Sequence, residues 1–303
     1  MSIVATNRKM LIIGDNPFQN ISHLSQQRAR ERGTKLNDPK YAAEVVSAAI
    51  ANGADGFIFS VSDKNLAILK SLNHDIHSVT PFKMYAITPY VFEFVRAAVL
   101  LGGITGLAKK SAMEIIRSYN IKAVASGLSG VVRNDPRALL RAFMSYEIAR
   151  IRSATQGKQE LSSVLVHEVI TDMALGMNMD WLFREHIASM KKLGLKPGFD
   201  TRNLPLLARR FKEWGIDPDG LLVIAPFNSI GFQMSPSREA CEDALNDMPK
   251  ADVFAFSLLA AGYFKPDQTI EYIKTLSALK GVIFGVSNTL QAENTFSVMR
   301  NAL

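Results

Sequence analysis

The chain has 303 residues, of which 48% are hydrophobic and 21% are charged, so it has the composition of a globular protein with a large core. It contains one cysteine, Cys241, which excludes an internal disulfide bond and any zinc site or iron–sulfur cluster built from cysteines of this chain alone. The formal charge of +7 favours anionic partners, but the basic residues are scattered and carry no nucleic-acid-binding motif, so nucleic acid is a disfavoured partner.

Membrane and export signals are missing from the sequence. No stretch of about 18 uncharged apolar residues is present, and no apolar segment of signal-peptide length precedes the first predicted strand. We therefore expect a cytoplasmic protein with no membrane partner. Whether the chain forms a homo-oligomer is left open.

Apolar runs of strand length alternate with helix-like segments along most of the chain. Eight runs predict strands, at residues 10–14, 56–60, 83–87, 163–167, 197–200, 221–225, 253–257 and 282–286. Most of these runs are continuously apolar, which is typical of parallel strands buried on both faces. The intervening segments carry helix signals: Asp38-Pro39 begins one helix, and Gly215 ends another at residues 204–214.

The connection between the third and fourth predicted strands is too long for one crossover helix. Residues 91–101, 108–119 and 135–154 each have the apolar spacing of a helix, which predicts a helical insertion at about residues 91–160. Alternatively, residues 121–126 form a ninth strand of an open, doubly wound sheet. The regular alternation favours one domain over residues 1–303: a (β/α)8 TIM barrel with a helical insertion between strands 3 and 4.

In such barrels the active site lies at the carboxyl ends of the strands. His167 and Asp200 are the leading candidates there, because a titratable group beside a barrel core is costly to bury unless it is used. We expect them to transfer protons, with Asp63, Asp15 and Glu168 as further catalytic candidates. His167 and Glu168 are neighbours, so they cannot both face inward unless the strand has already ended.

The same strand ends offer groups for a metal ion, a substrate and a phosphate. A divalent metal held by Asp63, His167 and Asp200 is an alternative use of those side chains, since imidazole and carboxylate suit such ions. The residues predicted to bind substrate are Asn16, His23, Arg202 and Asn228. Small residues after the last two strands would let backbone N–H groups approach a phosphate, and those predicted to do so are Gly262, Gly285, Ser287 and Asn288.

Part of the chain resembles the aldo-keto reductases. Residues 164–167 (VLVH), 254–262 (FAFSLLAAG), 284–288 (FGVSN) and 291–294 (QAEN) are similar to that family's fourth, seventh and last strands and its nucleotide-binding turn. The resemblance covers about residues 160–296 and implies a (β/α)8 barrel with a histidine, His167, at its rim.

The resemblance stops at two positions that the family uses for hydride chemistry and at one that it uses to bind the nucleotide. Asp63 matches the family's aspartate after the second strand, but no tyrosine follows in residues 64–72. Thr88-Pro89 stands where the family has a lysine, and residues 288–294 lack the basic residue that holds a nucleotide 2′-phosphate. NADP is therefore the less favoured cofactor.

Together these patterns predict a barrel enzyme that acts on a small anionic metabolite, a phosphorylated carbonyl or carbohydrate-like compound. Acid/base chemistry at His167 and Asp200 predicts a lyase or an isomerase. The first alternative is an NAD(P)-dependent oxidoreductase related to aldo-keto reductases, and the second is a non-catalytic binding barrel.

Overall fold

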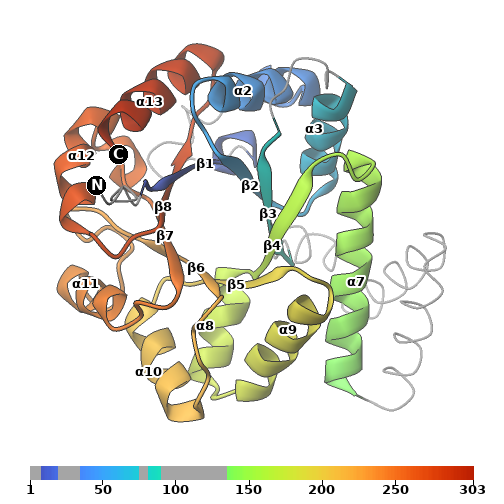
Figure 1. Cartoon of the computed structure of the whole chain (residues 1–303), viewed down its shortest axis with the longest axis vertical. Coiled ribbons are helices and arrows are strands. Elements are labelled where there is room, and N and C mark those ends of the chain that lie inside the picture. The colour runs from blue at the N-terminus through green and yellow to red at the C-terminus, as the bar shows by residue number, and fades with distance from the viewer. Residues whose placement is uncertain (1–7, 20–34, 75–80, 90–134) are drawn as a thin grey trace, which may run out of the picture.

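The computed structural model describes residues 8–19, 35–74, 81–89 and 135–303. Eight parallel strands form a closed barrel in chain order, with β8 paired to β1, and helices surround it (Figure 1). The strands are β1 (Met10–Gly14), β2 (Gly56–Ser60), β3 (Lys83–Thr88), β4 (Glu160–Val166), β5 (Lys196–Asp200), β6 (Leu222–Pro226), β7 (Asp252–Phe256) and β8 (Gly281–Gly285). The predicted TIM barrel is therefore confirmed.

The helices described in the structure follow the strands in the order that a (β/α)8 barrel requires. They are α2 (Pro39–Ala51), α3 (Asp63–His74), α7 (Pro136–Thr155), α8 (Glu168–Gly176), α9 (Asp180–Lys192), α10 (Leu204–Trp214), α11 (Arg238–Asn246), α12 (Pro266–Thr275) and α13 (Thr289–Ala302), with 3-10 helices η1 (Asn16–Gln19) and η2 (Ala260–Gly262). Two predicted helix ends are confirmed. Asp38 accepts a hydrogen bond from the Lys40 N–H at the start of α2, and Gly215 ends α10 in the left-handed conformation. None of the described helices is long and apolar enough to cross a membrane.

The strand β4 differs most from its prediction. It starts at Glu160 and ends at Val166, so His167 lies outside it as the N-cap of α8. Because the strand has ended, strand alternation no longer places His167 and Glu168 on opposite faces. The other strands agree with the predicted ranges to within one residue at each end.

Only the last part of the predicted insertion can be compared with the structure. Residues 135–154 were expected to be helical, and α7 covers Pro136–Thr155 with Asp135 as its N-cap. The predicted helices at 91–101 and 108–119, and the alternative strand at 121–126, lie outside the described residues.

Side chains of the strands alternate between the barrel interior and the surrounding helices. The interior is filled by one apolar cluster: Ile12, Ile58, Tyr85, Ile87, Leu165, Leu222, Ile224, Phe254 and Ile283. Two residues further toward the carboxyl ends, the next inward position is glycine on β1 and β8, namely Gly14 and Gly285. On β5 that position is Asp200, and His167 follows β4. The carboxyl end of the barrel therefore carries glycines on the β8–β1 side and titratable side chains on the β4–β5 side.

Candidate functional site

Polar side chains that follow β4, β5, β6 and β7 come together at the carboxyl end of the barrel. We call these residues the mouth cluster: His167, Glu168, Asp172, Asp200, Thr201, Arg202, Gln233 and Ser257. Val166 pairs with Phe199 in the β4–β5 ladder, so the next residues along the chain, His167 and Asp200, lie side by side. The structure thus brings together four residues that the sequence predicted for the site, the two others being Glu168 and Arg202.

His167 is held by the helix that it caps. Its Nδ1 accepts a hydrogen bond from the Val169 backbone N–H at 3.2 Å, which leaves Nε2 as the protonated nitrogen of the neutral ring. Burial lowers the pKa of His167, and although Glu168 opposes this effect, Arg202 adds to it. The side chain is therefore an uncharged hydrogen-bond donor at neutral pH.

Arg202 is the centre of the mouth cluster. Its Nε donates to Glu168 in an ion pair, its Nη1 donates to Gln233 Oε1, and its backbone N–H donates to Asp172 Oδ2 at 3.0 Å. Its guanidinium carbon also lies 4.9 Å from the centre of the Phe256 ring, within the range of a cation–π contact. These partners belong to the ends of β4, β6 and β7, and Arg202 itself follows β5, so its contacts connect four neighbouring strand ends of the barrel mouth.

Asp200 is a buried acid beside other acids. Its side chain faces the barrel interior and the residue is only 7% exposed, and its Oδ1 has no hydrogen-bond partner. Burial raises the pKa of Asp200 well above its ordinary value, and the neighbouring Glu168 and Asp172 reinforce that shift more than Arg202 counters it. Asp200 is therefore a carboxyl group that keeps its proton where ordinary aspartates have lost theirs.

Two residues of the mouth cluster have strained backbones. Gln233 has φ of 63° and Ser257 has φ of 56°, a region that favours glycine. The Ser257 hydroxyl donates to Gln233 Oε1 at 2.9 Å, so the two strained residues are bonded to each other and, through Gln233, to Arg202. Strain of about 1 kcal/mol or more per residue persists where the surroundings impose it, which is common at functional sites.

Asp15, predicted as a catalytic residue, lies in a separate polar group at the ends of β1 and β2. Its Oδ2 accepts hydrogen bonds from the Ser60 N–H at 2.9 Å and from Asn65 Nδ2 at 2.6 Å. Burial raises the pKa of Asp15 to about 6, although these hydrogen bonds favour the ionised form. Its contacts hold the β1 and β2 ends together.

The structure corrects the expectation for Asp63. Its side chain is 82% exposed and pairs with Arg150 of α7, because it stands in the first turn of α3 on the outside of the barrel. It cannot join His167 and Asp200, and no group of three metal-binding side chains occurs among the residues that the structure describes. The predicted Asp63–His167–Asp200 metal site is therefore wrong.

The other predicted substrate residues lie in different places. Asn228 is fully buried. Its Nδ2 donates to the Phe232 carbonyl at 2.8 Å and to the Ser257 carbonyl at 3.3 Å, and its Oδ1 accepts from the Phe232 N–H at 2.7 Å. Asn16 is exposed at the start of η1. His23 lies outside the described residues.

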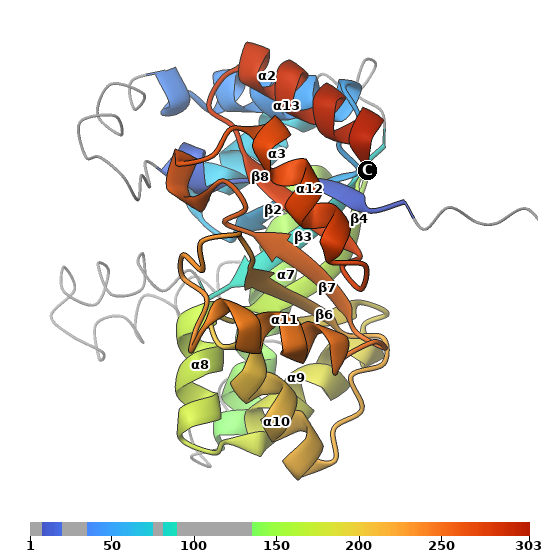
Figure 2. The same cartoon turned by 90° about the vertical axis from the view of Figure 1, so that its left-hand side faces the viewer.

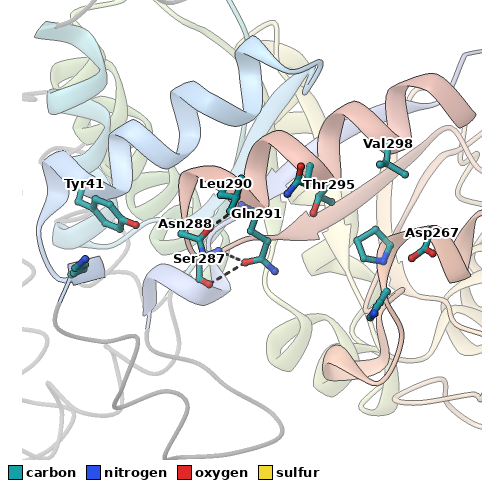
Figure 3. Close-up of a pocket in the computed structure, with 12 residues that line it drawn as sticks. Tyr41, Asp267, Ser287, Asn288, Leu290, Gln291, Thr295 and Val298 are labelled. Atoms are coloured by element: carbon teal, nitrogen blue, oxygen red, sulfur yellow. Dashed lines mark hydrogen bonds between the residues drawn. The ribbon is translucent and has the colours of Figure 1, made fainter.

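A pocket of about 1000 Å³ lies beside the barrel, between α2, α12 and α13 (Figure 3). Its lining residues are Lys35, Tyr41, Lys265, Pro266, Asp267, Ser287, Asn288, Leu290, Gln291, Asn294, Thr295 and Val298. We call it the α12–α13 pocket. Figure 2 shows both helices on the β8 side of the barrel. The N-terminus of α13 opens into the pocket, and two lysines from other elements add positive charge.

Two of the four predicted phosphate residues line this pocket. Ser287 donates from its backbone N–H and its hydroxyl to Gln291 Oε1, at 2.9 and 3.1 Å, and Asn288 accepts from the Gln291 N–H at 2.8 Å (Figure 3). Both side chains therefore close the first turn of α13. Gly285 is exposed at the end of β8, and Gly262 lies in the turn of η2.

Sequence reasoning missed several residues that the structure places at these two sites. They are Asp172, Gln233 and Ser257 in the mouth cluster, and Lys35 and Lys265 in the α12–α13 pocket. The two lysines could not be paired from the sequence, because they belong to segments far apart in the chain. The positive φ of Gln233 could not be predicted either, because glutamine is not a residue type that favours it.

Solved structures similar to this chain include two described as putative aldo-keto reductases from Pseudomonas aeruginosa. One is 13% identical with a TM-score of 0.57 and covers 96% of this chain and 90% of its own, and the other is 14% identical with a TM-score of 0.56, covering 96% and 89%. A glycerol dehydrogenase from Gluconobacter oxydans is 10% identical with a TM-score of 0.52, covering 95% and 85%. No protein-family model and no curated protein sequence matches this chain.

At these identities the likeness establishes the fold. The chain has the eight-stranded barrel that these aldo-keto reductases also have, and the similarity extends over nearly the whole chain instead of residues 160–296 alone. The prediction of a lyase or isomerase is corrected by the same finding, since the similar structures are described as reductases and a dehydrogenase.

Proposed function

We propose that this protein is an NAD(P)-dependent oxidoreductase that acts on a carbonyl compound or the corresponding alcohol. The observation that carries the proposal is the α12–α13 pocket, which has the volume of a cofactor site and joins the barrel where β8 ends. The similar structures described as putative aldo-keto reductases support the same class of reaction.

The lining of the α12–α13 pocket suits the adenosine and phosphate groups of such a nucleotide. Lys35 and Lys265 would pair with phosphate, and the N-terminus of α13 is favourable for an anion. Gln291 and Asn294 present amide groups that can hydrogen-bond a base or a ribose. The two lysines take the place of the basic residue that residues 288–294 lack, so a 2′-phosphate is compatible with the site.

The two strand ends next to this pocket carry glycines and therefore no side chains. Gly14 and Gly285 are partners in the β1–β8 ladder, and both stand at inward positions. A Cβ atom on Gly285 would lie 3.1 Å from the Pro17 ring, closer than ordinary contact, so the close approach of Pro17 favours glycine at this strand end. The nicotinamide would lie over these glycines and, when bound, would supply or accept the hydride.

The mouth cluster contains groups for the accompanying proton. A carbonyl oxygen that becomes an alcohol must receive a proton, and Asp200 keeps one because burial and the nearby carboxylates raise its pKa. His167 would hold the same oxygen through its Nε2–H, since its lowered pKa keeps the ring neutral. These two residues would replace the tyrosine and lysine that the resemblance leads one to expect.

Titration of the protein with NADPH and with NADH, followed by nucleotide fluorescence, tests the proposal. We expect saturable binding with a micromolar dissociation constant, weakened about fivefold by Lys35→Ala or Lys265→Ala because each removes one partly exposed phosphate contact. Lys158→Ala is the control, since Lys158 lies at the opposite end of the barrel, just before β4. The absence of saturable binding, or equal loss with Lys158→Ala, would contradict the proposal.

A further inference from the structure

The mouth cluster has more carboxyl groups than cations. Glu168, Asp172 and Asp200 surround the single guanidinium group of Arg202, and each of the three acids influences its neighbours electrostatically. His167 adds no positive charge, because burial lowers its pKa. Among the residues that the structure describes, the charge balance of the mouth cluster is therefore opposite in sign to the net charge of +7 of the whole chain.

Two of the three guanidinium nitrogens of Arg202 already donate to partners within the mouth cluster. Its Nε is paired with Glu168 and its Nη1 with Gln233, while the ring of Phe256 covers one face at 4.9 Å. The Glu168 side chain is only 20% exposed. A carboxylate that displaced Glu168 from Arg202 would therefore leave a largely buried charge without its partner, which is strongly unfavourable.

Asp200 gives a second and independent indication. It faces the barrel interior, it is only 7% exposed, and its Oδ1 has no hydrogen-bond partner. A buried polar atom without a partner costs free energy, and such atoms in native structures call for an explanation. A hydroxyl group of a bound molecule would supply the missing hydrogen bond, whereas a carboxylate would bring negative charge toward the neighbouring acids Glu168 and Asp172.

We propose that Glu168 is a specificity-determining residue: by pairing with Arg202 it makes the mouth cluster accept an uncharged, hydroxylated substrate, which bonds to Asp200, and reject one that carries a carboxylate there. The inference rests on the proposed function, because it concerns the substrate of the same site. It replaces the anionic metabolite that the net charge of the sequence favoured.

Two probe molecules that differ in one terminal group, and through it in charge, test this inference. Xylonamide and xylonate share one hydroxylated carbon chain and end in a neutral amide and a carboxylate. Their binding to the full chain is measured by ligand-observed NMR titration, without and with NADP⁺. We expect the wild type to bind xylonamide about tenfold more tightly than xylonate, the ratio for loss of one hydrogen bond to a charged group.

Glu168→Gln should reverse this preference, because it frees the Arg202 guanidinium while keeping the shape of the side chain. The matched control is Glu185→Gln on α9, where Glu185 accepts from Arg141 at 2.9 Å away from the mouth cluster. It should keep the wild-type ratio. Unfolding midpoints of both variants show whether they fold, and the wild-type ratio remains decisive if Glu168→Gln does not.

Three results would overturn the inference: tighter or equal binding of xylonate by the wild type, an unchanged ratio in folded Glu168→Gln, or no binding of either probe. The proposed function fails differently. If NADPH does not bind but the ratio and its reversal are found, the oxidoreductase proposal is wrong and the role of Glu168 in selecting ligands stands.

Discussion

Two buried titratable groups on different sides of the barrel should make stability depend on pH in opposite directions. Asp15 is fully buried at the end of β1, and burial raises its pKa from 3.8 to about 6. His186 is fully buried on α9, where its Nε2 lies 3.0 Å from the Val164 carbonyl oxygen, and burial lowers its pKa from 6.5 to about 4. Figure 1 shows β1 and α9 on opposite sides of the barrel, so we expect their effects to add.

The sign of each effect follows from which state holds the proton more tightly. The folded state favours protonated Asp15, so this contribution is complete below pH 3.8 and is lost as the pH rises through about 6. The folded state disfavours protonated His186, so its contribution is complete above pH 6.5 and is lost as the pH falls toward 4. Each pKa difference corresponds to about 3 kcal/mol of unfolding free energy.

Urea unfolding of the wild type, Asp15→Asn and His186→Gln at a series of pH values measures both effects. Relative to the wild type, Asp15→Asn should gain about 3 kcal/mol as the pH rises from 3.8 to above 6. His186→Gln should gain about 3 kcal/mol as the pH falls from above 6.5 to 4. The double variant should show the sum. A difference between variant and wild type that stays constant with pH would refute the reasoning for that residue.

Three further substitutions test the roles assigned to single residues. Asn228→Ala should lower the unfolding free energy by about 2 kcal/mol, because the Phe232 N–H and carbonyl lose their buried partner; an unchanged urea midpoint would contradict that structural role. Gly198→Ala should also cost about 2 kcal/mol, since its Cβ would lie 2.5 Å from Leu165 Cγ, and an equally stable variant would show that the barrel interior can adjust there. Asp63→Asn should leave the unfolding midpoint and NADPH binding unchanged, because Asp63 is exposed outside the barrel mouth. Weakened NADPH binding in a titration would show that Asp63 does contribute to the site.

The barrel was predictable because its evidence is local. Strands buried on both faces leave continuous apolar runs, and helix ends leave signals such as Asp38 and Gly215, so most element ends could be placed closely. The end of β4 was the exception. Histidine is an uncommon N-cap, so nothing in the residue type of His167 showed that the strand had already ended.

The site was predictable only in part, because its pairings connect distant segments. Asp15 and Asp63 both follow a strand, yet one is buried under Ser60 and Asn65, and the other turns outward to Arg150 on α7. Strand ends could identify both as polar, but only the packing of the helices decides which one is buried. The pairing of Glu168 with Arg202 also joins residues that are far apart in the chain, and so does the pocket lined by Lys35 and Lys265. Such contacts leave no local pattern in the sequence.

The central claim is that the α12–α13 pocket holds a nicotinamide nucleotide whose reactive ring reaches the mouth cluster. A crystal structure of the protein with NADP⁺ tests it most directly. The account predicts density for the adenosine and its phosphates beside Lys35, Lys265 and Asn294, with the nicotinamide over Gly14 and Gly285. Density elsewhere on the protein, or none at a saturating concentration of NADP⁺, would contradict it.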